Sequence, residues 1–243
     1  MKNMKILKNA GSFLILTPEK ELREQLLRIE EGGRTCYQSQ KNEITQETAE
    51  EFIRMIIKRG HESVIEHSNM TVQFNNVSRG LTHQLVRHRL CAFSQESTRY
   101  VDYAKKGEGP DLEKFEIKFV VPPHQDENKK VKVDDNKEMS VVEMLQEYEK
   151  FYRSLRKAGW TPQDARQLLP IGIKSQIIVS ANFREWRHIF KMRTNKASHW
   201  ELRKLMCDLL KYLQKIIPVI FDDFVYAGAD QNNIPYFKKK PLE

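Results

Sequence analysis

The sequence has 243 residues, enough chain to bury the core of one large domain or of one subunit in an intertwined assembly. Hydrophobic residues make up 40% and charged residues 30%, so a substantial core under a well-solvated surface is expected. Lysine and arginine total 41 against 33 acidic residues, a net charge of +8. This excess favours anionic ligands but does not separate nucleic acid from small phosphorylated molecules, and a basic solvated surface explains it equally well.

Cysteine spacing and hydropathy exclude further classes of protein. Cys36, Cys91 and Cys207 lie far apart and lack the CxxC spacing of a zinc site or the pattern of a disulfide framework. The apolar run at 13–16 is too short for a signal peptide, and no stretch approaches the roughly 20 apolar residues that span a bilayer. We therefore predict no metal site, no membrane partner and a reducing, cytoplasmic location.

Two helices are predicted near the N-terminus. The Thr-Pro pair at 17–18 starts a helix that the Gly-Gly pair at 32–33 is expected to end. A second helix begins near 45–48, carries its apolar residues on one face, and ends at Gly60.

The middle of the chain alternates strand and helix patterns. Apolar residues at every second position predict half-buried strands at 70–74 and 115–121. Between them, helical spacing from 79 to 89 turns Leu81 and Leu85 inward. The polar run at 124–137 is predicted to be a surface loop.

The C-terminal half is mainly helical. Ser140 and Glu143 form a capping box for a long helix that ends at Gly159. A short helix, a strand and two further helices are expected at 161–170, 177–179, 184–193 and 197–216. This order gives no domain boundary, so we predict a single α+β domain over residues 1–243, with mixed helices and an antiparallel sheet.

The densest group of polar residues lies at 87–100. Gln84 precedes it on the helix face that also carries Arg87 and His88. The segment has three arginines, which repel one another and need compensating anions: Arg87, Arg89 and Arg99. Only Glu96 supplies an acid nearby, and surface ion pairs would each contribute only about 0–1 kcal/mol. The cluster therefore favours an anionic ligand.

A second cationic cluster follows the strand at 177–179. Its members are Asn182, Arg184, Arg187, His188 and Arg193. Asn182 is a candidate N-cap, and the helix N-terminus behind it offers backbone N–H groups to an anion. Ordinary capping plus a basic helix face explains these residues equally well. Arg166 is a third candidate, which alone would be an unremarkable helix charge.

Three other catalytic interpretations fail on spacing. His61 and His67 are six residues apart, whereas a helical zinc motif needs histidines four apart. Ser94 and Ser97 lack the Gly-x-Ser-x-Gly elbow of a serine hydrolase. Cys91 could be a nucleophile, yet single cysteines are more often small buried apolar residues.

The segment Arg87-His88-Arg89, followed by seven residues and Ser97, resembles the RHR-x7-S signature of flavin-dependent thymidylate synthases. Three further segments resemble family motifs in the same order. They are GHE-(S/T)-x-x-EH at 60–67, AR-x-x-LP at 165–170 and N-x-R…R…WE at 182–201. The likeness runs from about residue 60 to residue 205.

The resemblance implies a reaction and an assembly. The reaction is methylation of dUMP to dTMP, with methylenetetrahydrofolate as carbon donor and FAD, reduced by NADPH, as reductant. No enzyme nucleophile is needed. The family assembles as homotetramers in which subunits share each flavin, so the partners implied are these small molecules and three further copies of the chain, not nucleic acid.

Carried over by position, the resemblance also implies two sets of binding residues. The dUMP set is Gln84, Arg87, Gln95, Ser97, Thr98, Arg99, Arg166 and Arg193. The FAD set is His61, Ser63, Arg87, His88, Arg89, Gln95, Asn182, Arg184 and His188. The family arginine that matches Arg193 promotes ionisation at uracil N3, which makes Arg193 the predicted catalytic residue.

Three positions depart from the commonest family pattern. Gln95 stands where many members have Glu, Thr98 where some have Gly, and Ala197 where some have a flavin-contacting His. Two other functions remain open. A nucleic-acid-binding protein would show lysine-rich and aromatic surfaces and salt-dependent binding. A non-catalytic flavoprotein is distinguished from the enzyme only by a turnover assay.

Overall fold

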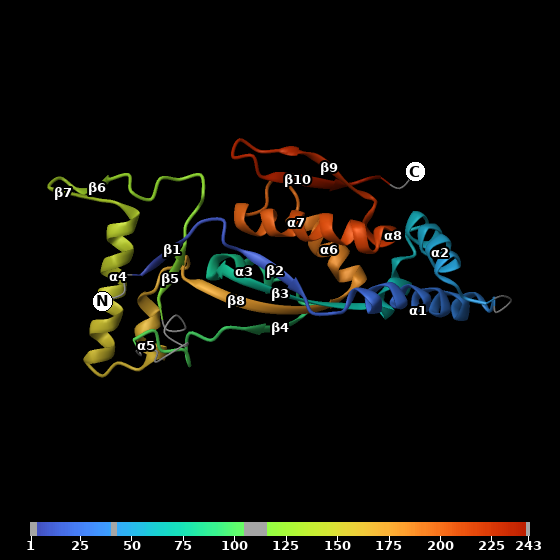
Figure 1. The fold of residues 1–243 in the computed structure, drawn as a ribbon, viewed down its shortest axis with the longest axis horizontal. Helices are drawn as coiled ribbons and strands as arrows, with labels where there is room; N and C mark the ends of the chain where they lie inside the picture. Colours follow the sequence, from blue (N-terminus) through green and yellow to red (C-terminus); the bar gives the residue numbers. More distant parts are fainter. Residues whose placement is uncertain (1–3, 40–42, 105–115, 242–243) are drawn as a thin grey trace. The chain divides into compact units, whose positions relative to one another are not determined.

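The computed structural model describes residues 4–39, 43–104 and 116–241 (Figure 1). Its chain forms two compact units, and each unit combines segments that are separate in the sequence. The first unit consists of Met1–Ser12, Asn75–His83 and Gln95–Ile177. The second consists of Phe13–Phe74, Gln84–Ser94 and Ile178–Glu243.

The first unit is built around a short sheet and a long helix. Its elements are β1 (Lys5–Leu7), the start of α3 (Arg79–Leu85), β5 (Lys118–Val120), β6 (Val131–Asp134), β7 (Lys137–Met139), α4 (Val141–Lys157), α5 (Pro162–Ala165) and the 3-10 helix η3 (Arg166–Leu168). Strands β1 and β5 pair in parallel, with Ile6 opposite Phe119, whereas β6 and β7 form an antiparallel hairpin. Phe119, Leu145 and Tyr152 belong to the buried core of this unit.

The second unit contains most of the helices. Its elements are β2 (Ser12–Ile15), α1 (Glu19–Tyr37), α2 (Gln46–Lys58), the 3-10 helix η1 (Glu62–His67), β4 (Ala92–Gln95), α6 (Phe183–Arg193), α7 (Trp200–Ile216), α8 (Pro218–Phe221), β9 (Phe224–Ala229) and β10 (Pro235–Lys239). Two longer strands, β3 (Asn69–Ser78) and β8 (Lys174–Asn182), contribute several residues to each unit, and one end residue of β2 (Ser12) and one of β4 (Gln95) belong to the first unit.

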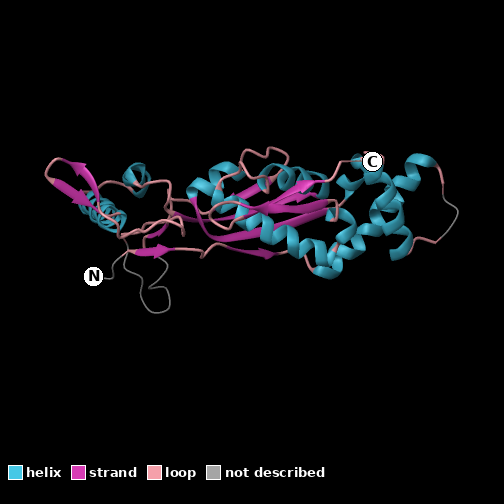
Figure 2. Ribbon diagram, turned by 90° about the horizontal axis from the view of Figure 1, so that it is seen from above, coloured by secondary structure: helices cyan, strands magenta, loops and turns pink. Residues whose placement is uncertain are grey.

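The largest sheet has the strand order β2-β3-β8-β4. Figure 2 draws these strands, like all others, in magenta. Helix α6 contacts this sheet, because the indole N–H of Trp186 donates to the carbonyl of Met70 at 3.0 Å. Helix α7 packs against α6 and against β10, which pairs with β9 in an antiparallel hairpin. Helix α6 begins directly after β8, so the residues at its N-terminus lie at the end of that strand.

Several sequence-based predictions are confirmed. Met70, Val72 and Phe74 are fully buried along β3, as their alternation indicates. The box that caps α4 is present: Oγ of Ser140 accepts from the backbone of Glu143 at 3.2 Å, and the Glu143 carboxylate accepts from Ser140 at 2.7 Å. Helix and antiparallel strand are mixed, as expected.

The predicted end of the first helix is wrong. Helix α1 continues through Gly32 and Gly33 to Tyr37. A Cβ atom built on Gly33 would lie 2.0 Å from Cζ of Phe52, which belongs to α2. The glycine therefore allows α1 and α2 to pack closely side by side, and the cost of glycine in a helix, about 1 kcal/mol relative to alanine, is tolerated for this contact.

Three other element predictions need correction. The run 124–137 is not all loop, because β6 lies within it and β7 begins at its end. Helix α3 ends at Leu85, earlier than predicted, and the strand expected at 115–121 is limited to β5, with Phe115 outside the described residues. The sequence patterns also missed the C-terminal hairpin of β9 and β10.

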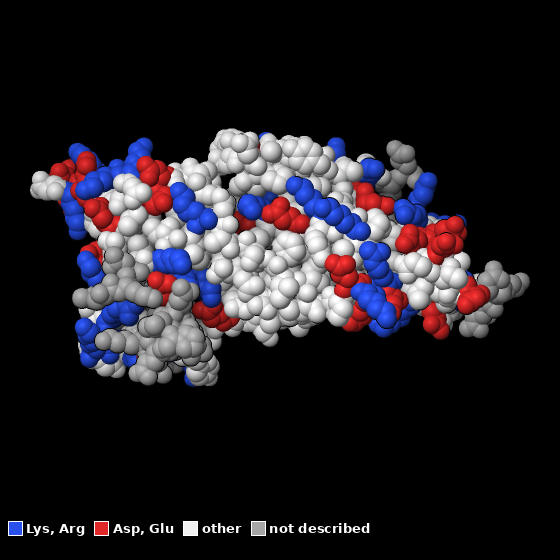
Figure 3. All heavy atoms as spheres, viewed as in Figure 1, with Lys and Arg blue, Asp and Glu red and all other residues white. Residues whose placement is uncertain are grey.

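No helix in the described part of the chain is long and apolar enough to cross a bilayer. On the face of the molecule shown in Figure 3, lysine and arginine side chains lie among acidic ones. The described residues on that face do not form a continuous basic stripe of the kind that tracks a nucleic-acid backbone.

Candidate functional site

Residues of the second unit that are distant in sequence meet around Arg193, the last residue of α6. Its Nε donates to Nε2 of His88 at 2.9 Å. Its two terminal nitrogens donate to Gln84, one to the side-chain oxygen at 3.2 Å and one to the backbone carbonyl at 2.9 Å. The structure thus joins two cationic clusters that the sequence separates by about a hundred residues.

His88 is buried and uncharged at neutral pH. Only 6% of it is exposed, and burial, together with the positive charge of Arg193 and the ring of His188, lowers its pKa to about 4. Because Nε2 of His88 accepts a hydrogen bond from a guanidinium, which has no acceptor atom, the ring proton must be on Nδ1. That Nδ1 lies 3.3 Å from a carboxylate oxygen of Glu185.

The guanidinium of Arg193 is partly buried and lies near a second positive charge, that of Arg87. Burial and the neighbouring charge of Arg87 lower its pKa, yet a guanidinium remains protonated in proteins. Arg87 and Arg89 are exposed and make no hydrogen bond or ion pair with any residue that the structure describes. Three guanidinium groups close together in sequence or space, without acidic partners, fit a multiply charged anion.

The other predicted FAD residues of the second unit lie around the N-terminus of α6 and on η1. Asn182 caps α6, because its side-chain oxygen accepts from the backbone of Glu185 at 2.8 Å. The ring of His188 is edge-on to His88 with centroids 5.6 Å apart, and Arg184 pairs with Glu66 at 2.5 Å. Ser63 is exposed on η1. A capped helix N-terminus and the exposed Arg87 and Arg89 offer the donors that the pyrophosphate of a dinucleotide needs, so the residues present fit FAD.

His61 and Gln95, also predicted to bind FAD, have internal partners. Nδ1 of His61 lies 3.0 Å from the hydroxyl of Tyr37. Gln95 belongs to the first unit, where its amide donates to the hydroxyl of Thr82 at 2.5 Å. All predicted FAD residues except Gln95 therefore belong to the second unit.

The predicted dUMP residues are divided between the units. Gln84, Arg87 and Arg193 are in the second unit, and the remaining members are in the first: Gln95, Ser97, Thr98, Arg99 and Arg166. Within the first unit, Arg166 donates to the hydroxyl of the buried Thr98 at 3.1 Å. Ser97 accepts from the backbone of Arg99 at 3.2 Å, and the Arg99 side chain donates to Gln163 at 3.1 Å.

Glu96 does not neutralise the arginine cluster of its own segment. Its carboxylate pairs with Lys174 at 2.7 Å and accepts from the hydroxyl of Tyr103 at 3.0 Å. Burial and this carboxylate raise the pKa of Tyr103, so the phenol stays protonated and donates. The acid that could have balanced Arg99 is thus committed elsewhere.

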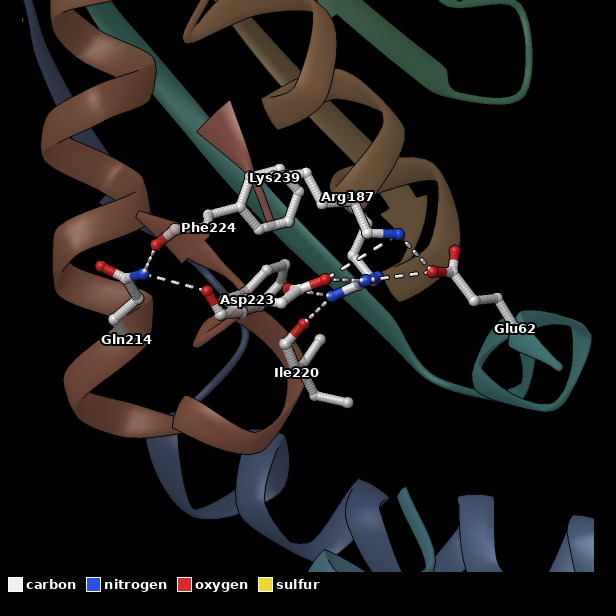
Figure 4. Close-up of polar contacts among 8 residues, drawn as sticks. Glu62, Arg187, Gln214, Ile220, Asp223, Phe224 and Lys239 are labelled. Atoms are coloured by element: carbon white, nitrogen blue, oxygen red, sulfur yellow. Dashed lines mark hydrogen bonds and ion pairs between the residues drawn. The ribbon is translucent and has the colours of Figure 1, made fainter. Parts of the chain in front are cut away.

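Arg187 differs from the other members of its cationic cluster. It is only 2% exposed, and its terminal nitrogens donate to Asp223 at 2.8 and 2.6 Å, to Glu62 at 3.0 Å and to the carbonyl of Ile220 (Figure 4). Lys239 completes the network through Glu62 at 2.7 Å. Of the two explanations that the sequence left open for this cluster, Arg187 fits the structural one, because its anionic partners are internal carboxylates.

Glu185 is the residue that the sequence analysis missed. It is 6% exposed, and burial raises its pKa, with an opposing contribution from His188. One signal was available: Glu185 stands three residues after the cap Asn182 and three before His188. Its contact with His88, by contrast, could not be read from spacing.

His88, Glu185 and His188 also place one potential metal-ligand atom each within 4.8 Å of one another. The sequence predicted no metal. The His88 nitrogen that faces Glu185 is Nδ1, and a metal bound there would need the ring proton on Nε2, where Arg193 already donates a hydrogen bond. The geometry therefore favours the arginine over a metal ion.

Cys91 is half-buried next to this cluster, and burial and the charge of Glu185 raise the pKa of its thiol to about 12. The thiol is protonated at neutral pH and is a poor nucleophile. We expect Cys91→Ala to keep turnover within a few-fold of the parent in a steady-state assay.

Ser97 is likewise not expected to attack the substrate. Ser97→Ala should raise the KM for dUMP while retaining turnover at saturation. Complete loss of chemistry in a folded, ligand-saturated variant of either Cys91 or Ser97 would contradict these two predictions.

The fold and the site define a mixed α+β protein whose arginines are arranged for anionic ligands. A family model described as thymidylate synthase complementing protein matches residues 20–219. Relatives called flavin-dependent thymidylate synthase include one from Mycobacteroides abscessus, 32% identical over 82% of this chain and 79% of its own length, and one from Corynebacterium glutamicum, 33% identical over 86% and 84%. The chain belongs to this family, the flavin-dependent thymidylate synthases.

Solved structures share the fold. Thymidylate synthase X from Helicobacter pylori, crystallised with FAD and dUMP, has a TM-score of 0.63 at 22% identity and covers 88% of this chain and 98% of its own. The UMP/dUMP methylase PolB from Streptomyces cacaoi has a TM-score of 0.67 at 17% identity, covering 90% and 96%.

Proposed function

We propose that the protein methylates dUMP to dTMP, using methylenetetrahydrofolate as carbon donor and FAD reduced by NADPH as reductant. The reaction would supply pyrimidine deoxynucleotides in the cytoplasm. The observation that carries the proposal is the guanidinium of Arg193, held by His88 and Gln84 beside the unpaired Arg87. Every proposed ligand is an anion, and arginine keeps its charge in a desolvated site.

The proposed roles follow the two residue sets. Arg87, Arg89 and the N-terminus of α6 capped by Asn182 would hold the FAD pyrophosphate, with Ser63 and His188 as further contacts. Arg99 and Arg166, with Ser97 and Thr98, would hold dUMP in the first unit. When bound, FAD supplies the reducing equivalents that complete the methyl group.

Arg193 would act on the uracil ring. Carbon C5 becomes nucleophilic when uracil carries negative charge after loss of the N3 proton. A preorganised guanidinium stabilises that charge without donating its own proton away, so the protein contributes positioning and electrostatic stabilisation and no covalent attack. The protonated state of Cys91 agrees with this mechanism.

A flavin titration followed by a turnover assay tests the proposal. The purified protein should be yellow or should bind added FAD, with absorbance at about 450 nm, a property of oxidised flavin. It should then form dTMP only when dUMP, methylenetetrahydrofolate and NADPH are all present. Flavin binding without dTMP would favour a non-catalytic flavoprotein, and failure to bind FAD together with salt-dependent binding of oligonucleotides would favour the nucleic-acid alternative.

We also propose a homotetramer with sites shared between subunits. The division of the predicted dUMP residues between two units of one chain is compatible with completion of each site by a second copy. Light scattering at micromolar concentration should give the mass of four chains. A fully active monomer would refute this part of the proposal.

A further inference from the structure

We infer that Glu185 and His88 form a positioning chain that orients the guanidinium of Arg193, so that both are positioning residues for the methylation reaction. The inference rests on the proposed function in one respect, the role of Arg193. In addition to the flavin contact that the family resemblance implies for His88, this inference gives His88 a second role, the positioning of Arg193. It also assigns a role to Glu185, which is not among the defined residues of any family motif.

The geometry of the chain is continuous. Glu185 lies in the first turn of α6, and its carboxylate oxygen is 3.3 Å from Nδ1 of His88. Nε2, on the opposite side of the same ring, accepts from Nε of Arg193 at 2.9 Å. The His88 ring, on the segment after α3, therefore connects Glu185 in the first turn of α6 to Arg193 at the end of the same helix.

The two supporting side chains are buried, and only the side chain that they orient can reach a ligand. Glu185 and His88 are each 6% exposed, whereas Arg193 is partly exposed and can reach a ligand. Burial lowers the pKa of His88 to about 4, so the ring is neutral and one nitrogen remains an acceptor at neutral pH. A charged ring would have two donors and would repel Arg193.

Glu185 selects the tautomer. An ionised carboxylate beside Nδ1 can only accept a hydrogen bond, so it favours the ring with Nδ1–H and a free lone pair on Nε2. That lone pair is what Arg193 requires. A carboxamide at position 185 could donate to Nδ1, which would move the ring proton to Nε2 and turn the acceptor toward Arg193 into a donor.

The first test compares two substitutions of His88. His88→Gln keeps an oxygen acceptor that can reach Arg193, whereas His88→Leu keeps volume without an acceptor. We expect His88→Leu to lower kcat about 10- to 100-fold with a smaller change in the KM for dUMP, because a displaced catalytic group loses transition-state stabilisation. His88→Gln should recover much of kcat, and Glu185→Gln should lower kcat although it is nearly isosteric.

A double-mutant cycle separates positioning from direct contact with flavin. If His88 acts through Arg193, His88→Leu should lower kcat little further in an Arg193→Ala background, in single-turnover assays at saturating FAD. Independent, multiplicative losses would overturn the inference while leaving the proposed function intact. Absence of dTMP formation by the parent protein would instead refute the proposed function.

A spectroscopic test does not depend on activity. In protein labelled with ¹⁵N-histidine, the His88 signals can be identified among the 7 histidines by their loss in His88→Gln. At neutral pH they should report a neutral ring with the proton on Nδ1, and Glu185→Gln should shift the proton toward Nε2. A charged ring, or an Nε2–H tautomer in the parent protein, would overturn the inference. Stoichiometric Zn²⁺ binding that alters the His88 and His188 signals together would do so as well.

Discussion

Replacing Arg193 with alanine should lower turnover at saturating dUMP and methylenetetrahydrofolate by roughly 10²–10³-fold, the usual loss when a preorganised donor to a developing negative charge is removed. The side chain is held by His88 and Gln84, so its guanidinium is fixed before substrate binds. The variant should stay folded and keep most of its flavin. Stopped assays of dTMP formation, with circular dichroism and flavin absorbance, measure these three properties.

A matched control is available two residues earlier on the same helix. Lys191 and Arg193 are both basic residues in the last turn of α6, and each would interact favourably with the helix dipole by about 0.3–1 kcal/mol. Lys191→Ala should therefore change stability slightly and turnover hardly at all. Arg193→Lys should rescue poorly, because one ammonium cannot reproduce the planar, forked contacts of a guanidinium. If Arg193→Ala and Lys191→Ala behave alike, Arg193 is structural.

Local patterns accounted for much of the fold, because they depend on neighbours in the sequence. The capping box at Ser140 and the alternation along β3 are complete within a few residues, and both were predicted. The end of α1 was not, because Gly33 is explained by Phe52 of another helix. The same holds for the C-terminal hairpin, where β9 and β10 need each other and α7 to form.

The candidate site shows the same limit. The sequence motifs predicted Arg193, His88 and Gln84 as site residues, but the contacts among them depend on tertiary structure. Arg187 and Arg193 stand six residues apart on one helix and were grouped together by charge. Arg187 is buried among acids, whereas Arg193 is partly exposed and lies near the charge of Arg87. Formal charge alone does not distinguish a structural arginine from a site arginine. The distinction depends on how deeply each residue is buried and on its partners.

Arg187→Met should destabilise the protein by about 3–5 kcal/mol, the usual loss when one partner of a buried ion pair is removed and its acids are left without their main cation. Methionine preserves most of the apolar stem, so the change isolates the charge. Urea denaturation of the flavin-free protein measures the free energy of unfolding. Arg184→Ala, on the same helix, is the matched control: its ion pair with Glu66 is exposed on both sides and should contribute only about 0–1 kcal/mol.

The difference in the free energy of unfolding between the parent protein and Arg187→Met should become smaller at acid pH. Burial alone would raise the pKa of Glu62, but Arg187 and Lys239 outweigh it and hold that pKa below its usual value. A carboxyl whose pKa is lowered by folding contributes stability above its unfolded pKa of about 4.3, and this contribution is lost as the pH falls through the folded value. The gap in unfolding free energy between the two proteins should therefore be full at pH 7 and shrink below about pH 4. A gap that is independent of pH, or no larger than that of Arg184→Ala, would mean that the Arg187 side chain stabilises the second unit by packing and not through its acids.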